Sequence, residues 1–142
     1  MIAVLEDDER RTVAMREELA QLFPEVESVF FDNAPDMVAW LRDNLRAVCL
    51  LCLDHDLGPV RERDGRTFDP GIGRDVVDFL VTQEPRCPVL IHSSNTESAY
   101  GMRFALDDAG WLAERMAPFD DLAWIKAEWS GRVAALWACG TA

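Results

Sequence analysis

Short apolar runs alternate with stretches of helical periodicity along the whole chain. Five such runs predict β-strands: Ile2–Leu5, Val26–Phe31, Ala47–Leu53, Cys87–Ile91 and Ala113–Ala117. The run Ala47–Leu53 contains no polar residue, which is typical of a parallel strand that helices cover on both faces. The pattern therefore favours a sheet buried between helices.

Between the strands, apolar residues recur every three or four positions, which is the spacing of the buried face of a helix. Asn33 followed by Pro35 predicts one helix start, and Ser94–Glu97 (SNTE) matches a capping box at another. The buried faces are expected to consist of Met15, Leu19, Leu22 and Phe23; Met37, Leu41 and Leu45; Ile72, Val76, Phe79 and Leu80; Ala99, Met102 and Leu106; and Leu122, Ile125, Trp129, Val133 and Leu136.

Five strand–helix units in succession predict an α/β fold. The expected architecture is a three-layer, doubly wound parallel sheet of five strands in the order 2-1-3-4-5 with right-handed crossovers. A length of 142 residues fits one domain, so residues 1–142 are expected to form a single domain. Gly58–Gly71 is polar and rich in turn formers, which predicts a long surface loop of the kind that often forms a lid or a binding segment. Trp111, Trp124 and Trp137 do not all fit the buried stripes and are expected to pack against neighbouring loops rather than to mark a partner surface.

The charge balance narrows the range of partners. The chain has 14 basic and 26 acidic residues, a net charge of −12, which disfavours binding to double-stranded DNA through its phosphates. A small phosphorylated ligand, or a short RNA end held by a local site, remains open. The N-terminus MIAVLEDDE becomes acidic after five residues, and no apolar run reaches the length of a membrane span. We therefore expect a cytoplasmic protein that does not contact a membrane.

Polar residues stand at the ends of three predicted strands. They are Glu6, Asp7 and Asp8 after the first strand, Asp54, His55 and Asp56 after the third, and His92, Ser93, Ser94 and Asn95 at the fourth. In doubly wound sheets the carboxyl ends of the strands share one edge, and ligands bind there beside the strand-order reversal between strands one and three. We therefore predict one site built from all three clusters. For any single cluster the alternative is simple helix capping, as for Asp8.

Carboxylates gathered in one place repel one another unless a cation or protons offset their charge. Their oxygens suit Mg²⁺ or Mn²⁺, which bridge readily to phosphates. We predict a divalent-cation site from Glu6 or Asp7 with Asp54, and with Asp56 beside them. Zinc bound by histidine and aspartate is less favoured, because neither His55 nor His92 has the spacing of a zinc motif.

The end of the fourth strand has a different chemistry. Ser93, Ser94 and Asn95, with the free amides of a helix start, predict a pocket for a phosphate group. His92 and His55 are predicted to exchange protons near neutral pH, with Asp54 as the third catalytic residue. The structural alternatives are a hydrogen-bonded turn residue for His55 and a semi-buried strand residue for His92.

These motifs resemble the receiver domain of two-component response regulators, a flavodoxin-like fold, over nearly the whole chain. VLEDDE resembles the family's acidic pair at Glu6 and Asp7, and LLCLDHDL places Asp54 at the phosphoacceptor aspartate. PVLIHSS places Ser93 at the family's hydroxyl position, and Ala117–Phe119 matches the lysine-proline-phenylalanine motif. Ala117 thus replaces the lysine. Arg115 projects to the same side of the strand, and whether it compensates is left open.

The histidines in LDHDLG and HSSN look more like a receiver-like subgroup predicted to process cyclic phosphates. The resemblance implies a metal-dependent phosphoesterase that opens a cyclic phosphate on a nucleotide or an RNA end. In that interpretation Asp7 and Asp54 hold the metal, and Ser93 with Asn95 orients the phosphate. Two alternatives stay open. One is an atypical receiver that binds signalling proteins, with Asp54 as phosphoacceptor, and the other is a degenerate fold that binds neither metal nor phosphate.

Overall fold

A parallel five-stranded sheet forms the centre of the protein in the computed structural model, which describes residues 1–141 and the side chains of residues 1–138. Its strands are β1 (Ile2–Leu5), β2 (Ser28–Phe31), β3 (Leu50–Leu53), β6 (Val89–His92) and β7 (Ala113–Met116). Across the sheet they follow the order β2-β1-β3-β6-β7, and every neighbouring pair is parallel. The predicted doubly wound fold is confirmed.

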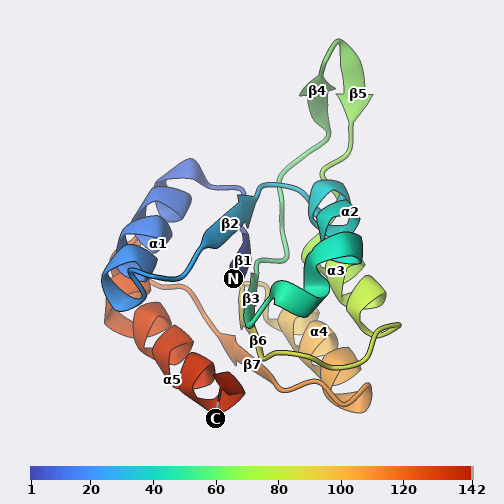
Figure 1. Cartoon of the computed structure of the whole chain (residues 1–142). Coiled ribbons are helices and arrows are strands. Elements are labelled where there is room, and N and C mark those ends of the chain that lie inside the picture. The colour runs from blue at the N-terminus through green and yellow to red at the C-terminus, as the bar shows by residue number, and fades with distance from the viewer. Residues whose placement is uncertain (142) are drawn as a thin grey trace.

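Helices cover both faces of this sheet. They are α1 (Glu9–Leu22), α2 (Ala34–Asn44), α3 (Gly73–Leu80), α4 (Thr96–Asp108) and α5 (Ser130–Thr141), with a short 3₁₀ helix η1 (Leu45–Ala47) after α2 and a π-helical turn η2 (Ile125–Trp129) before α5. Figure 1 shows α1 and α5 on one face and α2, α3 and α4 on the other. Among the described residues no helix combines the length and apolar character that crossing a membrane requires.

Most of the predicted helix faces are buried, with two exceptions at helix ends. Leu22 is 37% exposed at the last position of α1, and Ile72 is 41% exposed. Ile72 precedes α3 instead of belonging to its buried face, because its extended backbone forms a bridge with Asp56. Trp111 and Trp124 are buried, as expected of packing residues.

The helix starts agree with the sequence at one site and differ at another. The side chain of Asn33 accepts a hydrogen bond from the Asp36 amide and caps α2, as predicted. At α4 the cap is Asn95, whose side chain accepts from the Ser98 amide, so the prediction of Ser94 as the first capping-box residue is wrong by one position.

The segment Gly58–Gly71 is not an irregular loop, and that prediction is corrected. It contains an antiparallel hairpin, β4 (Arg61–Arg63) and β5 (Arg66–Phe68). Asp64 and Gly65 both have positive φ, 55° and 75°, as a tight two-residue Asp-Gly hairpin turn requires. Figure 1 shows the hairpin projecting beyond the carboxyl edge of the sheet, next to α2.

Candidate functional site

Glu6, Asp54 and His92 come together because of the sheet register. The three residues two positions before them are aligned across β1, β3 and β6, and all of them pack toward α1 and α5: Val4, Cys52 and Leu90. Since strand side chains return to the same face every second residue, the next side chains on this face are those of Glu6, Asp54 and His92. The predicted convergence of the three strand ends therefore holds for one residue from each strand.

These three side chains form a compact buried group. One ligand atom from each lies within 4.8 Å of the others. Nε2 of His92 is 3.3 Å from Oε1 of Glu6, and both side chains are fully buried. Yet neither this oxygen nor either ring nitrogen of His92 has a hydrogen bond among the described residues. The 3.3 Å contact is thus a close approach without hydrogen-bond alignment.

Buried polar atoms in folded proteins almost always have a partner. Two carboxylates and an imidazole within 4.8 Å of one another are a donor set that fits a divalent cation, and Oε1 of Glu6 and both ring nitrogens of His92 have no hydrogen bond among the described residues. The chemistry of the residues therefore agrees with the predicted cation site, with His92 as a member that the sequence did not place among the metal ligands.

Glu6 is ionised in this environment. Burial of its carboxyl group would raise its pKa, but the proximity of His92, the Asp8 amide and Arg11 together lower that pKa below its ordinary value. The Asp8 amide donates to Oε2 at 3.0 Å, and Nη1 of Arg11 lies 3.7 Å from Oε1. The negative charge is thus fixed on Glu6 across the neutral range.

Asp54 behaves in the opposite way. Burial raises its pKa to about 7, helped by the negative charges of Glu6 and Asp7, although His92 and the His55 amide act against the rise. That amide donates to Oδ1 of Asp54 at 2.7 Å. Near neutral pH the carboxyl group is therefore partly protonated, and a bound cation would favour its ionised form.

The other two predicted metal ligands lie at the rim. Asp7 is an exposed residue whose carboxyl group lies against Gly58, and partial burial with repulsion from Glu6 raises its pKa to about 6. The Asp56 side chain is 66% exposed and pairs with Nδ1 of His55 at 2.9 Å. Neither belongs to the group of donor atoms within 4.8 Å. Their roles as metal ligands stay predictions.

His55 is buried and held on both sides. Its ring contacts Asp56, and its carbonyl accepts a hydrogen bond of 2.8 Å from the amide of Gly73 at the start of α3. A Cβ atom on Gly73 would lie 1.9 Å from the carbonyl oxygen of Asp54. Only glycine allows α3 to approach the Asp54–His55 segment this closely, so Gly73 positions two of the predicted catalytic residues.

The predicted phosphate-binding residues are close together in the loop between β6 and α4. Ser93 is buried, and its hydroxyl accepts a hydrogen bond of 3.1 Å from the Asn95 amide. Ser94 is exposed, and the Asn95 side chain is occupied with capping α4. A phosphate-binding role for Ser93, Ser94 and Asn95 stays a prediction.

Arg115 lies beside this loop. Its Nη2 donates to the Ser93 carbonyl at 3.0 Å and to the Thr96 hydroxyl at 3.3 Å, and its guanidinium lies 5.5 Å from the ring centroid of Tyr100. Among the described residues it has no ion pair with Asp54. Arg115 therefore supports the loop between β6 and α4, and none of these contacts joins it to Asp54.

Two residues near His92 were missed by the sequence reasoning. The ring of Trp124 stacks on His92 with centroids 5.8 Å apart and an angle of 29° between the planes. The guanidinium of Arg11 lies over the Trp124 ring, 5.3 Å from its centroid, and also faces Glu6. The failure of Trp124 to fit the last buried helix stripe was the one available signal, but it did not identify His92 as the contact.

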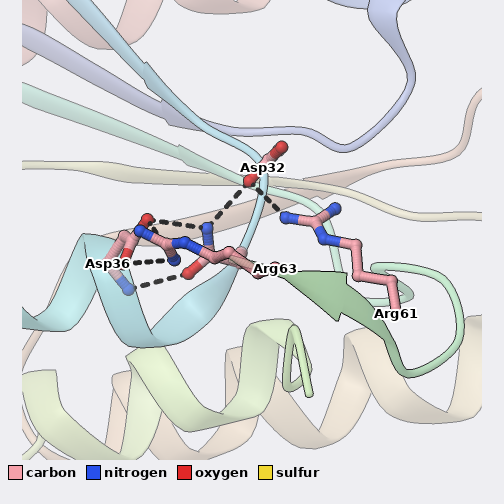
Figure 2. A network of polar contacts seen from close by, with 5 residues as sticks. Asp32, Asp36, Arg61 and Arg63 are labelled. Atoms are coloured by element: carbon pink, nitrogen blue, oxygen red, sulfur yellow. Dashed lines mark hydrogen bonds and ion pairs between the residues drawn. The ribbon is translucent and has the colours of Figure 1, made fainter. Parts of the chain in front are cut away.

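An open cavity adjoins the buried group on the side of β2. It measures about 520 Å³, and its lining residues are Glu6, Asp7, Glu9, Thr12, Arg16, Phe30, Phe31, Asp32, Asn33 and Asp36. Asp32 and Asp36 at its rim each pair with an arginine of the β4–β5 hairpin, as Figure 2 shows. The cavity therefore extends from Glu6 to the two carboxylates that pair with the hairpin.

With the fold and this geometry defined, comparison with known proteins identifies the family. The model of the cyclic-phosphate processing receiver domain matches residues 2–108. The chain belongs to this family. The match to the receiver domain spans β1 through α4 and so includes every residue of the buried group. No curated protein matches the chain.

Solved structures support the receiver-domain fold. The phosphorylated cyanobacterial phytochrome response regulator RcpA is 19% identical with a TM-score of 0.71, covering 96% of this chain and 92% of its own. A response regulator receiver domain from Rhodospirillum rubrum is 15% identical with a TM-score of 0.64, and the match covers 97% of this chain and 93% of that domain. Salmonella typhimurium RcsB is 16% identical with a TM-score of 0.58, and the match covers 97% of this chain and 59% of RcsB. At these identities the likeness is one of fold.

Proposed function

We propose that this receiver domain is a divalent-cation-dependent phosphoesterase that opens the cyclic phosphate of a nucleotide or of an RNA end. The observation that carries the proposal is the buried group of Glu6, Asp54 and His92, whose side chains match the donor set of a cation site and of which Glu6 and His92 have polar atoms without a hydrogen bond. The family description, cyclic-phosphate processing, points to the same class of substrate.

Glu6, Asp54 and His92 would hold the cation, with Asp7 at the entrance. Carboxylate oxygens bind both Mg²⁺ and Mn²⁺, whereas an imidazole nitrogen binds Mn²⁺ more readily than Mg²⁺. A divalent cation held there supplies Lewis-acid polarisation of the phosphoryl group.

We assign proton exchange with the substrate to His55, the histidine that does not belong to the buried donor group. Its Nδ1 is fixed by the Asp56 carboxylate at 2.9 Å, which orients the ring and leaves Nε2 for proton transfer. His92, the other histidine predicted to act in proton transfer, is fully buried beside Glu6, so we assign it to holding the cation. Ser93 and Asn95 remain the proposed contacts for the phosphate oxygens.

The test is hydrolysis of 2′,3′-cyclic and 3′,5′-cyclic nucleotides with Mn²⁺ or Mg²⁺, followed by identification of the phosphomonoester. We expect Asp54→Asn and His92→Ala each to reduce turnover by at least about 100-fold. Asp43→Asn, which removes an exposed carboxylate at the opposite edge of the sheet, is the matched control and is expected to stay within about twofold. Binding of the cation without turnover of any cyclic phosphate would overturn the proposal.

A second candidate is a phosphorelay receiver that binds signalling proteins. It is favoured by one observation, the position of Asp54 at the carboxyl end of the central strand β3. With a pKa of about 7, part of this carboxyl group is protonated near neutral pH and cannot act as a nucleophile, and Ala117 offers no positive charge where a receiver has its lysine. Mass measurement after incubation with acetyl phosphate and Mg²⁺ separates the candidates. A phosphate adduct that Asp54→Asn abolishes would favour the receiver function.

A further inference from the structure

The β4–β5 hairpin carries its arginines on one face. Residues opposite each other in a hairpin share a face, and Arg61 is opposite Phe68 while Arg63 is opposite Arg66. Because Arg61 and Arg63 are two residues apart, all four side chains lie on the same face. The guanidinium groups of Arg61 and Arg63 are 5.3 Å and 4.7 Å from the Phe68 ring centroid. The face is therefore basic with an aromatic ring at its centre.

Two ion pairs orient this face toward the body of the protein. Nη2 of Arg61 lies 2.9 Å from Asp32, and Nη1 of Arg63 lies 3.0 Å from Asp36 (Figure 2). All four side chains are partly exposed, and exposed pairs of this kind add little stability. Each guanidinium has five N–H donors, so both keep donors for a further anion.

Arg66 differs from its neighbours on the hairpin. Its side chain is exposed and has no hydrogen bond or ion pair among the described residues. Arg66 therefore adds an unpaired positive charge two positions from Phe68 on this face, in a chain whose net charge is −12. Repulsion from the rest of the surface would keep a polyanion away from most of the protein and leave this face as its place of contact.

The hairpin is continuous with the candidate site. Asp32 and Asp36, which hold the arginines, line the cavity of about 520 Å³ that also contains Glu6 and Asp7. A cavity of this size accommodates a nucleoside. The two ends of the segment that carries the hairpin are held beside Asp54 and His55. Asp56 forms a β-bridge with Ile72, and the Gly73 amide donates a hydrogen bond to the His55 carbonyl. The cavity therefore joins the buried group to the two carboxylates that pair with the basic face. Five of its ten lining residues are acidic, so a phosphate can occupy it only when a bound cation offsets their charge.

We propose that this face binds a single-stranded RNA whose cyclic-phosphate end occupies the candidate site. Arg66, Arg63 and Arg61 contact successive phosphates, and Phe68 stacks on a base. This inference rests on the proposed function, because it takes the cyclic phosphate to be the reacting end. Arginine is suited to the role, since its planar fork binds phosphate through two donors, and sequence-independent binding of single strands combines such cations with aromatic stacking. A mononucleotide would occupy the cavity but has no further phosphates for the hairpin arginines to bind.

The test compares binding of two probes by fluorescence anisotropy across a salt titration. One is a single-stranded RNA of about ten nucleotides that ends in a 2′,3′-cyclic phosphate, and the other is a labelled 2′,3′-cyclic mononucleotide. We expect Arg66→Ala to weaken RNA binding about fivefold or more and to reduce the salt slope by about 0.7. Phe68→Ala is expected to weaken RNA binding about tenfold. In both variants the ratio of RNA affinity to mononucleotide affinity falls.

Arg46→Ala is the matched control, because the Arg46 side chain is also exposed, has no partner among the described residues and lies in η1, before the amino end of β3. It is expected to change RNA binding by less than about twofold. Equal losses for Arg66→Ala and Arg46→Ala, or tighter binding of an acidic peptide than of RNA, would overturn the inference. Binding is measured without hydrolysis. RNA binding that depends on Arg66, without hydrolysis of a cyclic phosphate, would therefore support the RNA-binding face and reject the proposed function. Hydrolysis with an unchanged affinity ratio would support the proposed function and reject the RNA-binding face.

Discussion

Nε2 of His92 and Oε1 of Glu6 lie 3.3 Å apart in the fully buried interior without forming a hydrogen bond. Two ligands about 2.1 Å from one cation, at tetrahedral or octahedral angles, are themselves separated by roughly 3.0–3.4 Å. The separation observed between these atoms is therefore the one that a shared cation needs. It arises from the backbone, since β1, β3 and β6 deliver both residues in fixed register.

Removing the charge of Glu6 tests this relationship directly. Glu6→Gln keeps the shape of the side chain but replaces an anionic ligand by a neutral amide, so we expect Mn²⁺ affinity to fall at least about tenfold. Isothermal titration calorimetry measures the affinity. Glu17→Gln, on the exposed side of α1, is the control and should bind as the unsubstituted protein does. Equal affinities for Glu6→Gln and Glu17→Gln would show that the cation binds elsewhere.

The cation-free protein should lose stability as the pH rises. Burial raises the pKa of Asp54 to about 7 from 3.8, so the folded state holds this proton more tightly than the unfolded state does. Between these two values the unfolded state binds fewer protons, and the free energy of unfolding falls with increasing pH, by about 2 kcal/mol. Asp7, with a pKa of about 6, acts in the same direction. Urea unfolding in the presence of a chelator at pH 5, 6.5 and 8 measures the loss.

Asp54→Asn provides the control for this pH dependence. The amide does not titrate, so most of the slope between pH 5 and 8 should disappear, whereas Glu6, whose pKa is lowered, titrates below this range. Mn²⁺ should restore stability most strongly at pH 8, where Asp54 is ionised before the cation binds. A variant that kept the full slope would place its origin in another group.

The sequence predicted the fold and the edge of the sheet that carries the site, because both follow from the order of apolar runs. It did not decide between Glu6 and Asp7 as the buried ligand, since that choice depends on which face each side chain takes. The apolar residue Val4 lies two positions before Glu6, so counting in steps of two along β1 selects Glu6. The same count from Leu90 selects His92.

Other features could not be obtained from local patterns. The strands β4 and β5 have three residues each and are mostly charged, so they show no recognisable alternation of apolar and polar residues. Asp64-Gly65 was the one sequence signal of a hairpin turn. The ion pairs of β4, Arg61 with Asp32 and Arg63 with Asp36, join positions 29 and 27 residues apart. The stacking of Trp124 on His92 likewise depends on how the chain returns after β7. Such contacts are set by tertiary packing.

Gly73 should tolerate no side chain. A Cβ atom there would approach the carbonyl oxygen of Asp54 to 1.9 Å, so Gly73→Ala must displace either α3 or the Asp54–His55 segment. We expect a loss of about 2–4 kcal/mol in the free energy of unfolding and weaker cation binding. Gly131→Ala is the matched control. Its Cβ would meet nothing within 4 Å and it lies in α5, so it should stabilise the protein by about 0.5–1 kcal/mol. Equal effects of the two substitutions would contradict the close approach.

Trp124 should contribute both to the stability of the fold and to the orientation of the His92 ring. Its side chain is fully buried on the imidazole, and its Nε1 donates to the Asp121 carbonyl at 2.8 Å, in a turn where Asp120 and Asp121 both have positive φ. Trp124→Ala should therefore cost about 3–5 kcal/mol of unfolding free energy, measured in guanidinium chloride.

Trp124→Phe separates packing from positioning. It keeps a ring against His92 but removes the hydrogen bond to Asp121, so a smaller loss of about 1–2 kcal/mol is expected. The ring nitrogens of His92 have no hydrogen bond among the described residues, so the stacked Trp124 ring fixes the orientation of the imidazole. Mn²⁺ affinity should therefore fall severalfold in this folded variant. Phe104→Ala, at a position 73% exposed, is the control and should alter neither quantity. Unchanged Mn²⁺ affinity in Trp124→Phe would mean that the sheet alone, and not the ring above it, holds His92 in place.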